Sequence, residues 1–402
     1  MSPRAAGAST PAAGASTPAA GASTPAAGVI LPPAMLGVLG GGQLGRFFVI
    51  AARQMGYRVA VLDPDPESPA GALADLHLAV GFEDRGALDE LAARCEAITT
   101  EFENVPAASL AYLATRRRVA PAAECVAISQ DRIREKAALA ANGFPIGAYA
   151  PIEREADLER TELYPAILKR ARFGYDGKGQ ARVATPQAAR EAWSGFEGAP
   201  CVLERQLALD CEVSVVVARG QDGATVPFTV AENRHRHGIL DVSIAPARVA
   251  EPLAREAQAL AERLAGVLGY VGVLGVEYFV TGGKLLVNEI APRPHNSGHY
   301  TIEACVTSQY AQQVRALCGL PLGDARLLSP AVMVNVLGEA WNAGEPDWHA
   351  VLAEPRAKLH LYGKTSARPG RKMAHITVLD AERERALEVA LALRARLGIV
   401  DG

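Results

Sequence analysis

The residues best suited to phosphate chemistry lie in a glycine-rich stretch over 173–180, which reads Phe-Gly-Tyr-Asp-Gly-Lys-Gly-Gln. Three glycines in eight residues disfavour both a helix interior and a well-packed strand. They predict a loop whose backbone N–H groups can approach anionic oxygens. Lys178 inside the loop and Lys169 just before it add positive charge. The stretch therefore indicates a lid over phosphates, although a glycine-rich hairpin with surface lysines would have the same composition.

A second stretch places two carboxylates where they could share a cation. Apolar runs on both sides of a glycine turn at 281–284 predict a β-hairpin. Glu277 and Glu289 lie twelve positions apart, so both can face one side of this hairpin as near partners. Asn288 supplies a neutral oxygen beside them, and oxygen ligands of this kind suit Mg²⁺. The alternative is a solvated hairpin that carries two surface glutamates.

The N-terminal region contains a third motif with two interpretations. Gly40, Gly42 and Gly45 have the GxGxxG spacing inside a predicted strand–helix–strand unit, and Asp63 closes its second strand. This pattern matches a dinucleotide-binding fingerprint and makes an NAD-linked oxidoreductase a serious alternative. The same turn and helix N-terminus can bind any phosphate. We therefore favour a phosphate or substrate site here.

Further polar groups lie at the ends of predicted elements. Glu101 and Glu103 lie at the end of a predicted strand over 97–103, where α/β sheets bind ligands, or they belong to a solvated strand edge. Residues 129–132 predict the start of a helix that runs to Ala141, on which Arg132 has Glu135 as an alternative partner.

The second half of the chain contains three more polar stretches. Residues 231–238 predict a loop at the mouth of a site, and residues 292–300 predict a second loop before a helix over 301–317. Lys364 and Arg371 flank a predicted turn that could hold a phosphate, although exposed turn residues are the simpler reading. Composition alone favours surface positions for Glu204 and Glu212, which otherwise could contact a nucleotide.

Composition limits the class of protein. The 402 residues predict two or three domains, and the net charge of −3 argues against a general nucleic-acid or acidic-membrane binder. The six cysteines have no CxxC spacing, which indicates a reduced cytosolic protein. No run approaches the ~20 apolar residues of a membrane span. Three Ala-Ala-Gly-Ala-Ser-Thr-Pro repeats over 5–25 predict a disordered tail that is neither a signal peptide nor a transit peptide.

Together these stretches resemble the ATP-grasp family, in which a glycine-rich loop covers the nucleotide and a Glu…Asn-Glu hairpin holds magnesium. Within that family the chain is similar to the carboxylases of purine biosynthesis, over roughly residues 36–380. The segments that carry the resemblance are 40–46, 99–106, 130–132, 172–180, 231–237, 288–299 and 364–375.

The resemblance implies an α/β fold in three parts. After a disordered tail over 1–34, we expect an N-terminal Rossmann-like (pre-ATP-grasp) substrate domain over 35–127. An ATP-grasp domain over 128–325 and a small β-rich C-terminal domain over 326–402 follow. No mutase domain is expected in this chain, so the product would pass to a separate mutase.

The resemblance also implies roles for individual residues. The ATP-binding residues would be Arg132, Lys169, Gly174, Tyr175, Asp176, Gly177, Lys178, Gly179, Gln180, Glu204, Arg205, Gln206, Leu207, Glu212, His235, Asn288 and Glu289. The ribonucleotide would meet Gln43, Leu44, Glu101, Tyr175, Asp176, Arg293, His295, Asn296, Lys364 and Arg371. The metal would be held by Glu277 and Glu289. The catalytic residues would be Tyr175, Asp176, Lys178 and Arg293, with Asp176 orienting the reacting amine or accepting its proton.

The implied reaction is ATP- and Mg²⁺-dependent carboxylation of 5-aminoimidazole ribonucleotide by bicarbonate, through carboxyphosphate. The resemblance also implies a cytoplasmic homodimer. Its expected partners are small molecules, and neither nucleic acid nor a membrane is expected. Three alternatives stay open. Another ATP-grasp ligase, such as a formate-dependent glycinamide ribonucleotide transformylase, would take formate. An NAD-binding oxidoreductase would need no magnesium, and a non-catalytic nucleotide-binding module would not hydrolyse ATP in response to substrate.

Overall fold

The structure, a computed structural model, describes residues 28–159, 162–174 and 179–399. The repeats over 5–25 and the four loop residues Tyr175, Asp176, Gly177 and Lys178 lie outside the described residues. Residues 28–34, which we expected to belong to a disordered tail, instead contact the folded body. The Ile30 N–H donates to the Cys318 carbonyl at 2.9 Å, and the Tyr57 hydroxyl donates to the Ile30 carbonyl at 2.8 Å.

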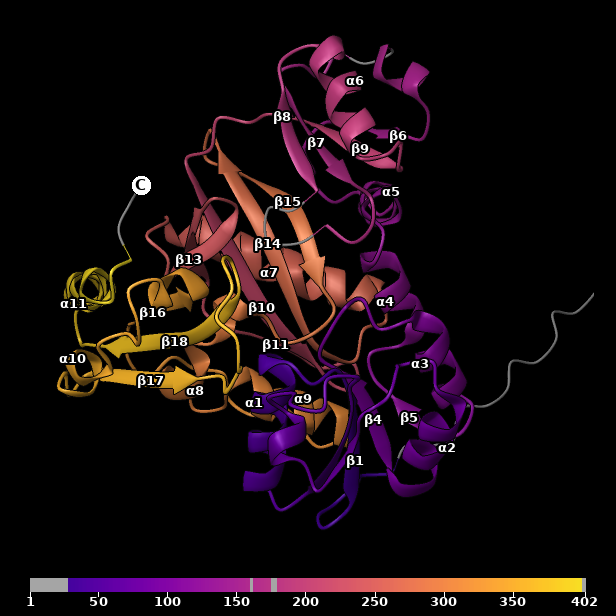
Figure 1. Cartoon of the computed structure of the whole chain (residues 1–402), viewed down its shortest axis with the longest axis vertical. Helices are drawn as coiled ribbons and strands as arrows, with labels where there is room; N and C mark the ends of the chain where they lie inside the picture. The colour runs from indigo at the N-terminus through magenta and orange to yellow at the C-terminus, as the bar shows by residue number, and fades with distance from the viewer. Residues whose placement is uncertain (1–27, 160–161, 175–178, 400–402) are drawn as a thin grey trace, which may run out of the picture.

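The N-terminal region is a parallel sheet in the order β3-β2-β1-β4-β5, the Rossmann-like arrangement that the sequence predicted (Figure 1). Its strands are β1 (Met35–Leu39), β2 (Arg58–Leu62), β3 (Leu76–Leu78), β4 (Ala97–Thr100) and β5 (Arg118–Val119). Its helices are α1 (Gln43–Gln54), α2 (Arg85–Arg94), α3 (Ala107–Ala114), α4 (Ala123–Ser129) and the short η1 (Gly71–Leu73). The strand predicted over 97–103 ends at Thr100, so Glu101 and Glu103 lie in the loop that follows.

A small antiparallel sheet forms the top of the molecule in Figure 1, in the order β6-β9-β7-β8. Its strands are β6 (Tyr149–Ile152), β7 (Ala166–Arg170), β8 (Gln180–Val183) and β9 (Cys201–Arg205), covered by η2 (Glu155–Glu159) and α6 (Pro186–Gly195). Helix α5 (Arg132–Ala141) precedes this sheet. The Asp131 side chain caps α5 by accepting from the Ile133 N–H at 3.0 Å, within the stretch 129–132 where the sequence predicted the start of this helix.

A large sheet occupies the centre of the molecule, in the order β15-β14-β10-β12-β13-β16-β18-β17 with β11 paired to β10. Its first strands are β10 (Cys211–Arg219), β11 (Thr225–Pro227), β12 (Ala231–Arg236), β13 (Ile239–Ala245), β14 (Gly272–Thr281) and β15 (Lys284–Ala291). The predicted loop over 231–238 is wrong, because β12 occupies most of it and only His237 and Gly238 turn the chain into β13. Helix α7 (Glu251–Val267) covers one face with its buried alanines and Leu264.

The C-terminal strands continue this large sheet. Strands β16 (Ala331–Leu337), β17 (Ala357–Leu361) and β18 (Lys372–Leu379) follow β13 in an unbroken antiparallel ladder. They are accompanied by η4 (Gly338–Trp341), α10 (Trp348–Leu352) and α11 (Arg383–Arg396), whose apolar side chains pack on β16 and β18. The region that we expected as a small β-rich domain therefore shares its sheet with the central region.

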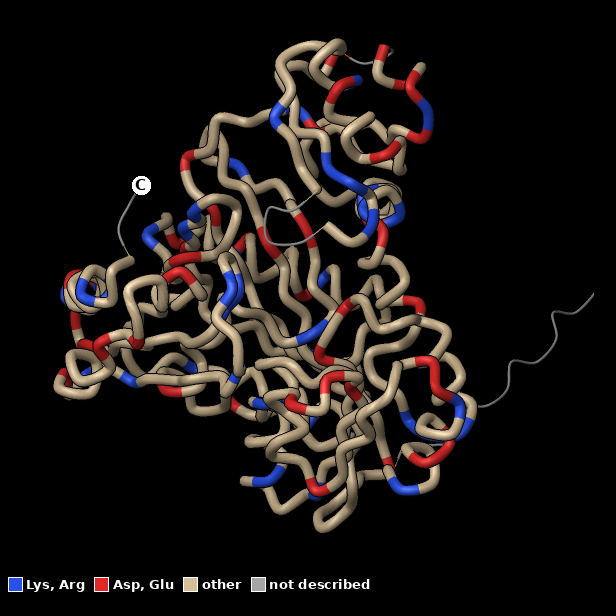
Figure 2. Tube along the Cα trace, viewed as in Figure 1, with Lys and Arg blue, Asp and Glu red and all other residues tan. Residues whose placement is uncertain are grey.

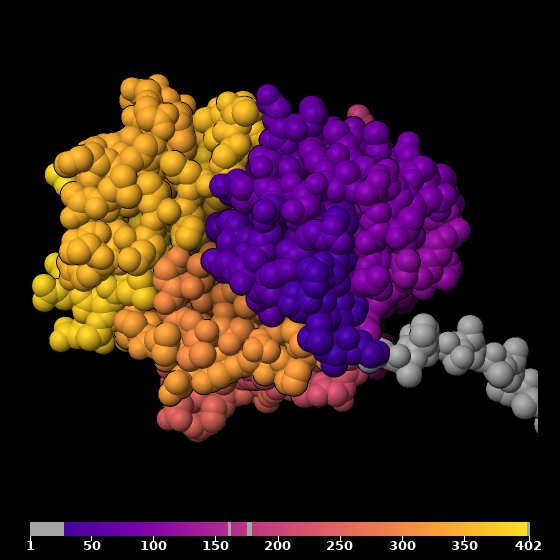
Figure 3. Space-filling view, turned by 90° about the horizontal axis from the view of Figure 1, so that it is seen from below, coloured from indigo at the N-terminus to yellow at the C-terminus, as the bar shows by residue number. Residues whose placement is uncertain are grey.

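The segment after β15 connects the three regions. It contains η3 (Asn296–Gly298), α8 (Thr301–Ala304) and α9 (Gln309–Cys318), so the helix predicted over 301–317 is wrong: it is interrupted between Cys305 and Ser308. Phe47 of α1 packs on Tyr310 of α9 with ring centroids 5.2 Å apart. Figure 3 shows the N-terminal region packed directly against both this segment and the C-terminal region.

Charged residues of both signs are interspersed along the described chain (Figure 2). Among the described residues, no helix combines the length and apolar character needed to cross a membrane. The described cysteines are all free thiols.

Candidate active site

A cavity of about 1410 Å³ is lined by all three regions. Most of the predicted site residues line it. These are Gln43, Leu44, Glu101, Arg132, Lys169, Gly174, Gln180, Glu212, His235, Glu277, Asn288, Glu289, Arg293, His295, Asn296, Lys364 and Arg371. Of the described residues predicted for the site, Gly179, Glu204, Arg205, Gln206 and Leu207 are not among the lining residues. The fold thus brings residues of the two glycine motifs, the hairpin and the C-terminal turn, which are distant in sequence, to one cavity.

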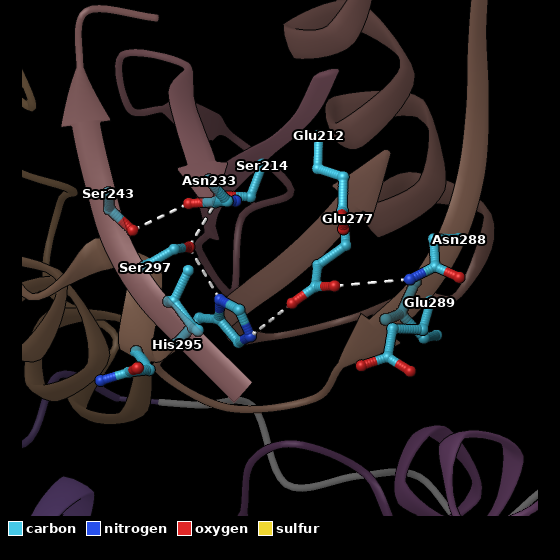
Figure 4. Close-up of polar contacts among 12 residues, drawn as sticks. Glu212, Ser214, Asn233, Ser243, Glu277, Asn288, Glu289, His295 and Ser297 are labelled. Atoms are coloured by element: carbon cyan, nitrogen blue, oxygen red, sulfur yellow. Dashed lines mark hydrogen bonds and ion pairs between the residues drawn. The ribbon is translucent and has the colours of Figure 1, made fainter. Parts of the chain in front are cut away.

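The β14–β15 hairpin brings its two glutamates face to face. From Thr281 paired with Lys284, a regular ladder would place Glu277 opposite Asn288. A β-bulge after Glu277 adds one residue and makes Glu289 its partner instead. Partners across an antiparallel pair project from the same face, so both carboxylates point toward the cavity (Figure 4). The predicted pairing is confirmed, and the bulge is what produces it.

The hairpin has the donor set that a divalent cation needs. The amide nitrogen of Asn288 lies 3.5 Å from Glu277 Oε2, whereas its oxygen is buried without a hydrogen-bond partner. A buried oxygen that lacks a partner beside two carboxylates fits Mg²⁺, which prefers oxygen ligands. Burial opposes ionisation of Glu277, but the hydrogen bond that His295 donates, together with other neighbouring groups, outweighs it and lowers the pKa of this carboxyl.

Arg132 holds the second glutamate of the hairpin. Its guanidinium donates to Glu289 Oε2 at 2.7 Å and to the Gly174 carbonyl at 3.3 Å, at the start of the glycine-rich loop. Its suggested partner on the helix, Glu135, instead accepts from the Ile290 N–H at 3.2 Å. Burial and the charge of Glu289 raise the pKa of Glu135. The suggested ion pair between Arg132 and Glu135 is therefore wrong. Arg132 instead connects the start of the glycine-rich loop to the hairpin.

Lys169 belongs to a buried charge network between the small and large sheets. Its ammonium lies 2.8 Å from Glu204 Oε2, and Lys136 of α5 lies 3.5 Å from Glu204 Oε1. Lys136 also donates to the Asn288 carbonyl at 2.9 Å. Burial opposes ionisation of Glu204, but both ammonium groups lower the pKa of this carboxyl to about 2. The surface position that composition favoured for Glu204 is wrong, whereas Glu212 is partly exposed, as a surface residue would be, and lines the cavity.

Arg293 is held in place by a carboxylate that we did not predict as its partner. Glu103 accepts from Arg293 Nε and, at 3.0 Å, from Nη2, which forms a bidentate pair. Burial raises the pKa of Glu103, but Arg293 outweighs it and lowers the pKa to about 2. Gln130 fixes the same loop by donating to the Glu103 and Val105 carbonyls, each at 2.7 Å. The N-terminal region therefore positions a side chain of the central region.

The GxGxxG turn already contains two carboxylates of the protein. Glu101 accepts from the Gly42 N–H at 2.7 Å and from the Gly45 N–H at 2.8 Å, and Asp63 accepts from the Gly41 N–H at 2.7 Å. Glu101 thus caps helix α1, whose N-cap Gly42 has no side chain to do so. These are the N–H groups that a dinucleotide pyrophosphate would use. The NAD interpretation is disfavoured for this reason.

The remaining predicted residues lie around the rim and floor of the cavity. His235 Nδ1 lies 3.2 Å from Glu212 Oε2, and although burial lowers the pKa of His235, neighbouring carboxylates raise it overall. At the C-terminal turn, Lys364 donates to the Lys372 carbonyl at 2.7 Å and Arg371 donates to the Ser366 carbonyl at 2.9 Å.

Sequence reasoning missed Glu135 and Lys136 as site residues. For Glu103 it left open a ligand site or a solvated strand edge, and it did not find the partner Arg293. Glu135 and Lys136 follow Arg132 by three and four positions, so they share its helix face, and this spacing could have found them. Glu103 follows Glu101 by two positions, but its role depends on Arg293, which is distant in sequence. No local pattern marks that contact.

Family models match the three regions in order. They are the Ribonucleotide synthetase preATP-grasp domain over 34–130, the ATP-grasp domain over 137–310 and the Phosphoribosylaminoimidazole carboxylase C-terminal domain over 331–389. The N5-carboxyaminoimidazole ribonucleotide synthase of Bacillus subtilis is 44% identical over 352 residues, which cover 87% of this chain and 92% of the relative. The chain belongs to this synthase family.

Solved structures of the family agree. An ADP complex of N5-carboxyaminoimidazole ribonucleotide synthetase aligns with a TM-score of 0.86 at 42% identity, covering 91% of this chain and 97% of that one. The Aspergillus clavatus synthase in complex with ADP and 5-aminoimidazole ribonucleotide aligns with a TM-score of 0.83 at 31% identity, covering 91% of this chain and 99% of that one. The fold is therefore an ATP-grasp fold, and the protein is an ATP-dependent ligase that forms a carbon–nitrogen bond. The expected ATP-grasp fold and ligase class are confirmed.

Proposed function

We propose that this protein uses ATP and bicarbonate to carboxylate the exocyclic amine of 5-aminoimidazole ribonucleotide, yielding N5-carboxyaminoimidazole ribonucleotide, ADP and phosphate in purine biosynthesis. The observation that carries the proposal is one cavity that joins the Glu277–Glu289 hairpin to the basic C-terminal turn and to Arg293. Full-length similarity to synthases of this name, one of them solved with ADP and 5-aminoimidazole ribonucleotide, supports the same substrates.

Glu277, Glu289 and the unpaired oxygen of Asn288 are the residues that would hold Mg²⁺. The bound ion would neutralise charge on the ATP phosphates. Lys169 and Arg132 approach the same region from the small sheet and from α5 and would bind the phosphates. Gly174, Gly179 and Gln180 flank the four loop residues that lie outside the described structure, and we keep the whole loop as the ATP lid.

We assign the ribonucleotide to the part of the cavity that the C-terminal turn lines. Lys364 and Arg371 would supply positive charge for its phosphate, and Arg293, held by Glu103, lines the same cavity. Gln43, Leu44, Glu101, His295 and Asn296 also line the cavity and stay predicted contacts of the ribonucleotide. Tyr175 and Asp176 stay predicted contacts for the ring and the amine, and Lys178 for the transferring phosphate. We keep residues 204–207 as the predicted contacts of the adenine edge. Because the Glu204 carboxylate pairs with Lys169, the backbone of this segment would make these contacts.

The reaction follows from this arrangement. An oxygen of bicarbonate attacks the γ-phosphorus of ATP, the bond to the β–γ bridging oxygen breaks, and ADP leaves. The amine then attacks the carbon of carboxyphosphate, or of CO₂ after phosphate has left, and loses one proton. Arg132, Lys169 and Arg293 stabilise the negative charge on the transferring oxygens, which is where most of the catalysis arises.

Three further parts of the proposal concern organisation. We keep domain boundaries near 127 and 325, a cytoplasmic homodimer, and release of the product to a separate mutase. Size-exclusion chromatography with light scattering tests the dimer directly.

The deciding experiment measures ADP release with ATP, Mg²⁺ and bicarbonate, with and without 5-aminoimidazole ribonucleotide. We expect strong stimulation by the ribonucleotide that is absent in Glu289→Gln. Stimulation by formate with glycinamide ribonucleotide instead would indicate the transformylase alternative. Hydrolysis without any ribonucleotide stimulation would contradict the proposed substrate.

A further inference from the structure

A chain of buried polar contacts leads along one face of the large sheet to the Glu277 carboxylate (Figure 4). Ser214 Oγ lies 2.7 Å from Ser297 Oγ, and Ser297 Oγ lies 2.8 Å from His295 Nδ1. His295 Nε2 lies 3.2 Å from Glu277 Oε1. Ser214 and Ser297 are 2% and 1% exposed, so water does not compete for these contacts.

The fold itself produces this chain. Ser214 on β10 is the cross-strand partner of Glu277 on β14, so the two side chains lie side by side in the ladder. His295 and Ser297 come from the segment around η3, which follows the hairpin and packs on the same face of the sheet. The His295 backbone is fixed independently, because its N–H donates to Gln309 Oε1 at 2.8 Å and its carbonyl accepts from Gln309 Nε2 at 2.8 Å.

The chemistry of the two ends determines where the protons lie. A carboxylate only accepts hydrogen bonds, so the His295 Nε2 that faces Glu277 carries a hydrogen. In the neutral ring Nδ1 is then an acceptor, and the hydroxyl of Ser297 must donate to it. The oxygen of Ser297 is left to accept from the Ser214 hydroxyl, which lies 2.7 Å away. Each donor in the chain therefore has one acceptor.

From this chain we infer that Ser297, supported by Ser214, is a positioning residue that fixes His295 as the Nε2–H tautomer and thereby holds the Glu277 carboxylate ready for the cation. The inference rests on the proposed function only in treating Glu277 as a metal ligand. Both ring nitrogens of His295 contact protein groups, so His295 acts through Glu277 and contacts the ribonucleotide through its carbon edge at most. Ser297 itself touches neither substrate.

The first test reads the tautomer without any substrate. In enzyme labelled with ¹⁵N-histidine, spectra that correlate the ring nitrogens with ring protons should show His295 with Nε2 protonated and Nδ1 unprotonated, the signals being assigned by their loss in His295→Gln. In Ser297→Ala the Nδ1 signal should move toward that of a nitrogen without a hydrogen-bond donor. A wild-type ring protonated on Nδ1, or an Nδ1 signal unchanged in Ser297→Ala, would overturn the inference.

The second test measures binding of ADP by calorimetry with and without Mg²⁺. Loss of a residue that orients a metal ligand typically weakens metal affinity 10- to 100-fold. We expect Ser297→Ala to weaken Mg²⁺-dependent ADP binding roughly 10-fold and to leave ADP binding without Mg²⁺ unchanged. A purely structural role for Ser297 would weaken both equally, and equal weakening would overturn the inference.

Matched variants keep both tests decisive. Ser243→Ala removes an equally buried hydroxyl, which donates to Asn233 Oδ1 at 2.8 Å and does not contact His295, and it should behave as wild type. Ser214→Ala leaves the Ser297–His295 contact intact and should have a smaller effect than Ser297→Ala. If Ser297→Ala does not fold, Ser297→Cys provides a side chain of similar size with a weaker donor and should give an intermediate Mg²⁺ effect. Absence of ribonucleotide-stimulated ADP release in the wild type would contradict the proposed function but leave the tautomer result valid.

Discussion

The molecule holds carboxylates in two contrasting ways. At the N-terminal glycine turn, Glu101 accepts from two backbone N–H groups and needs no further partner. At the β14–β15 hairpin, Glu277 and Glu289 face each other, and their donors are side chains that come from other elements. In the first arrangement the donors are backbone groups of one turn, whereas the second leaves the Asn288 oxygen beside the carboxylates without a hydrogen-bond partner. Glutamates are therefore held by backbone groups in one region and by side chains in the other.

The largest effect should follow from removing a hairpin carboxylate. Glu289→Gln keeps the shape of the side chain but removes a negative charge from the cation site and the partner of Arg132. A bound metal contributes several kcal/mol to transition-state stabilisation, so kcat for ribonucleotide-dependent ADP release should fall by at least about 100-fold. Glu251→Gln, on an exposed carboxylate of α7, should retain activity. Near-normal turnover of Glu289→Gln would contradict a catalytic role for the hairpin carboxylates.

A pH titration of stability should distinguish Glu101 from its neighbour Glu103. Arg293 lowers the pKa of Glu103 to about 2, so the ion pair stabilises the fold above the unfolded pKa near 4.5 and loses this effect as pH falls toward 2. Burial raises the pKa of Glu101, so its contribution is present below 4.5 and disappears as pH rises through the raised pKa.

Urea denaturation across pH 2–7 measures this difference. Glu103→Gln should lower the free energy of unfolding by up to about 3 kcal/mol at neutral pH and should reduce its fall between pH 4.5 and 2. Glu101→Gln should instead reduce the fall in the free energy of unfolding as pH rises above 4.5. Parallel pH profiles for the two variants would mean that the two carboxylates are held alike.

Lys136→Met should disturb the hairpin and spare the glycine turn. The variant leaves the Asn288 carbonyl without its buried donor, which costs about 1–3 kcal/mol. Because Asn288 adjoins Glu289, the KM for ATP should rise while the KM for the ribonucleotide stays constant. Arg134→Met lies on the same helix, but Arg134 pairs with Glu124 at the surface, and this variant should leave both values unchanged. Equal changes in both KM values would indicate general loosening of the fold.

The smallest effect should come from crowding the glycine turn. Gly42 has a φ of −72°, so alanine there meets no backbone strain, but its Cβ would lie 2.7 Å from Glu101 Oε1. Displacing that carboxylate should cost about 1–3 kcal/mol in the free energy of unfolding. Gly266→Ala in helix α7 has no atom within 4 Å of the added Cβ and should be neutral or slightly stabilising. A stable Gly42→Ala variant would show that Glu101 is free to move.

Local patterns predicted much of this molecule. The glycine turn, the helix start within 129–132 and the β14–β15 hairpin could be read from spacing and capping chemistry. The partner of Glu289 could not, because Arg132 is 157 positions away in sequence. The strand β12 was hidden because polar residues predominate in it, and its hydrogen-bond ladder, rather than an apolar face, establishes it. Patterns report local geometry, whereas these contacts depend on packing between distant segments.

The continuity of the large sheet has a consequence for producing fragments of this protein. A chain cut after β15 or α9 would leave β13 without β16 and expose a row of unpaired N–H and C=O groups along its edge. Val242 and Ile244 on that strand would lose the apolar partners Val332 and Val334 as well. Such a fragment is expected to pair edge to edge with other copies and aggregate, so the nucleotide-binding half should become soluble only when the C-terminal strands are supplied with it.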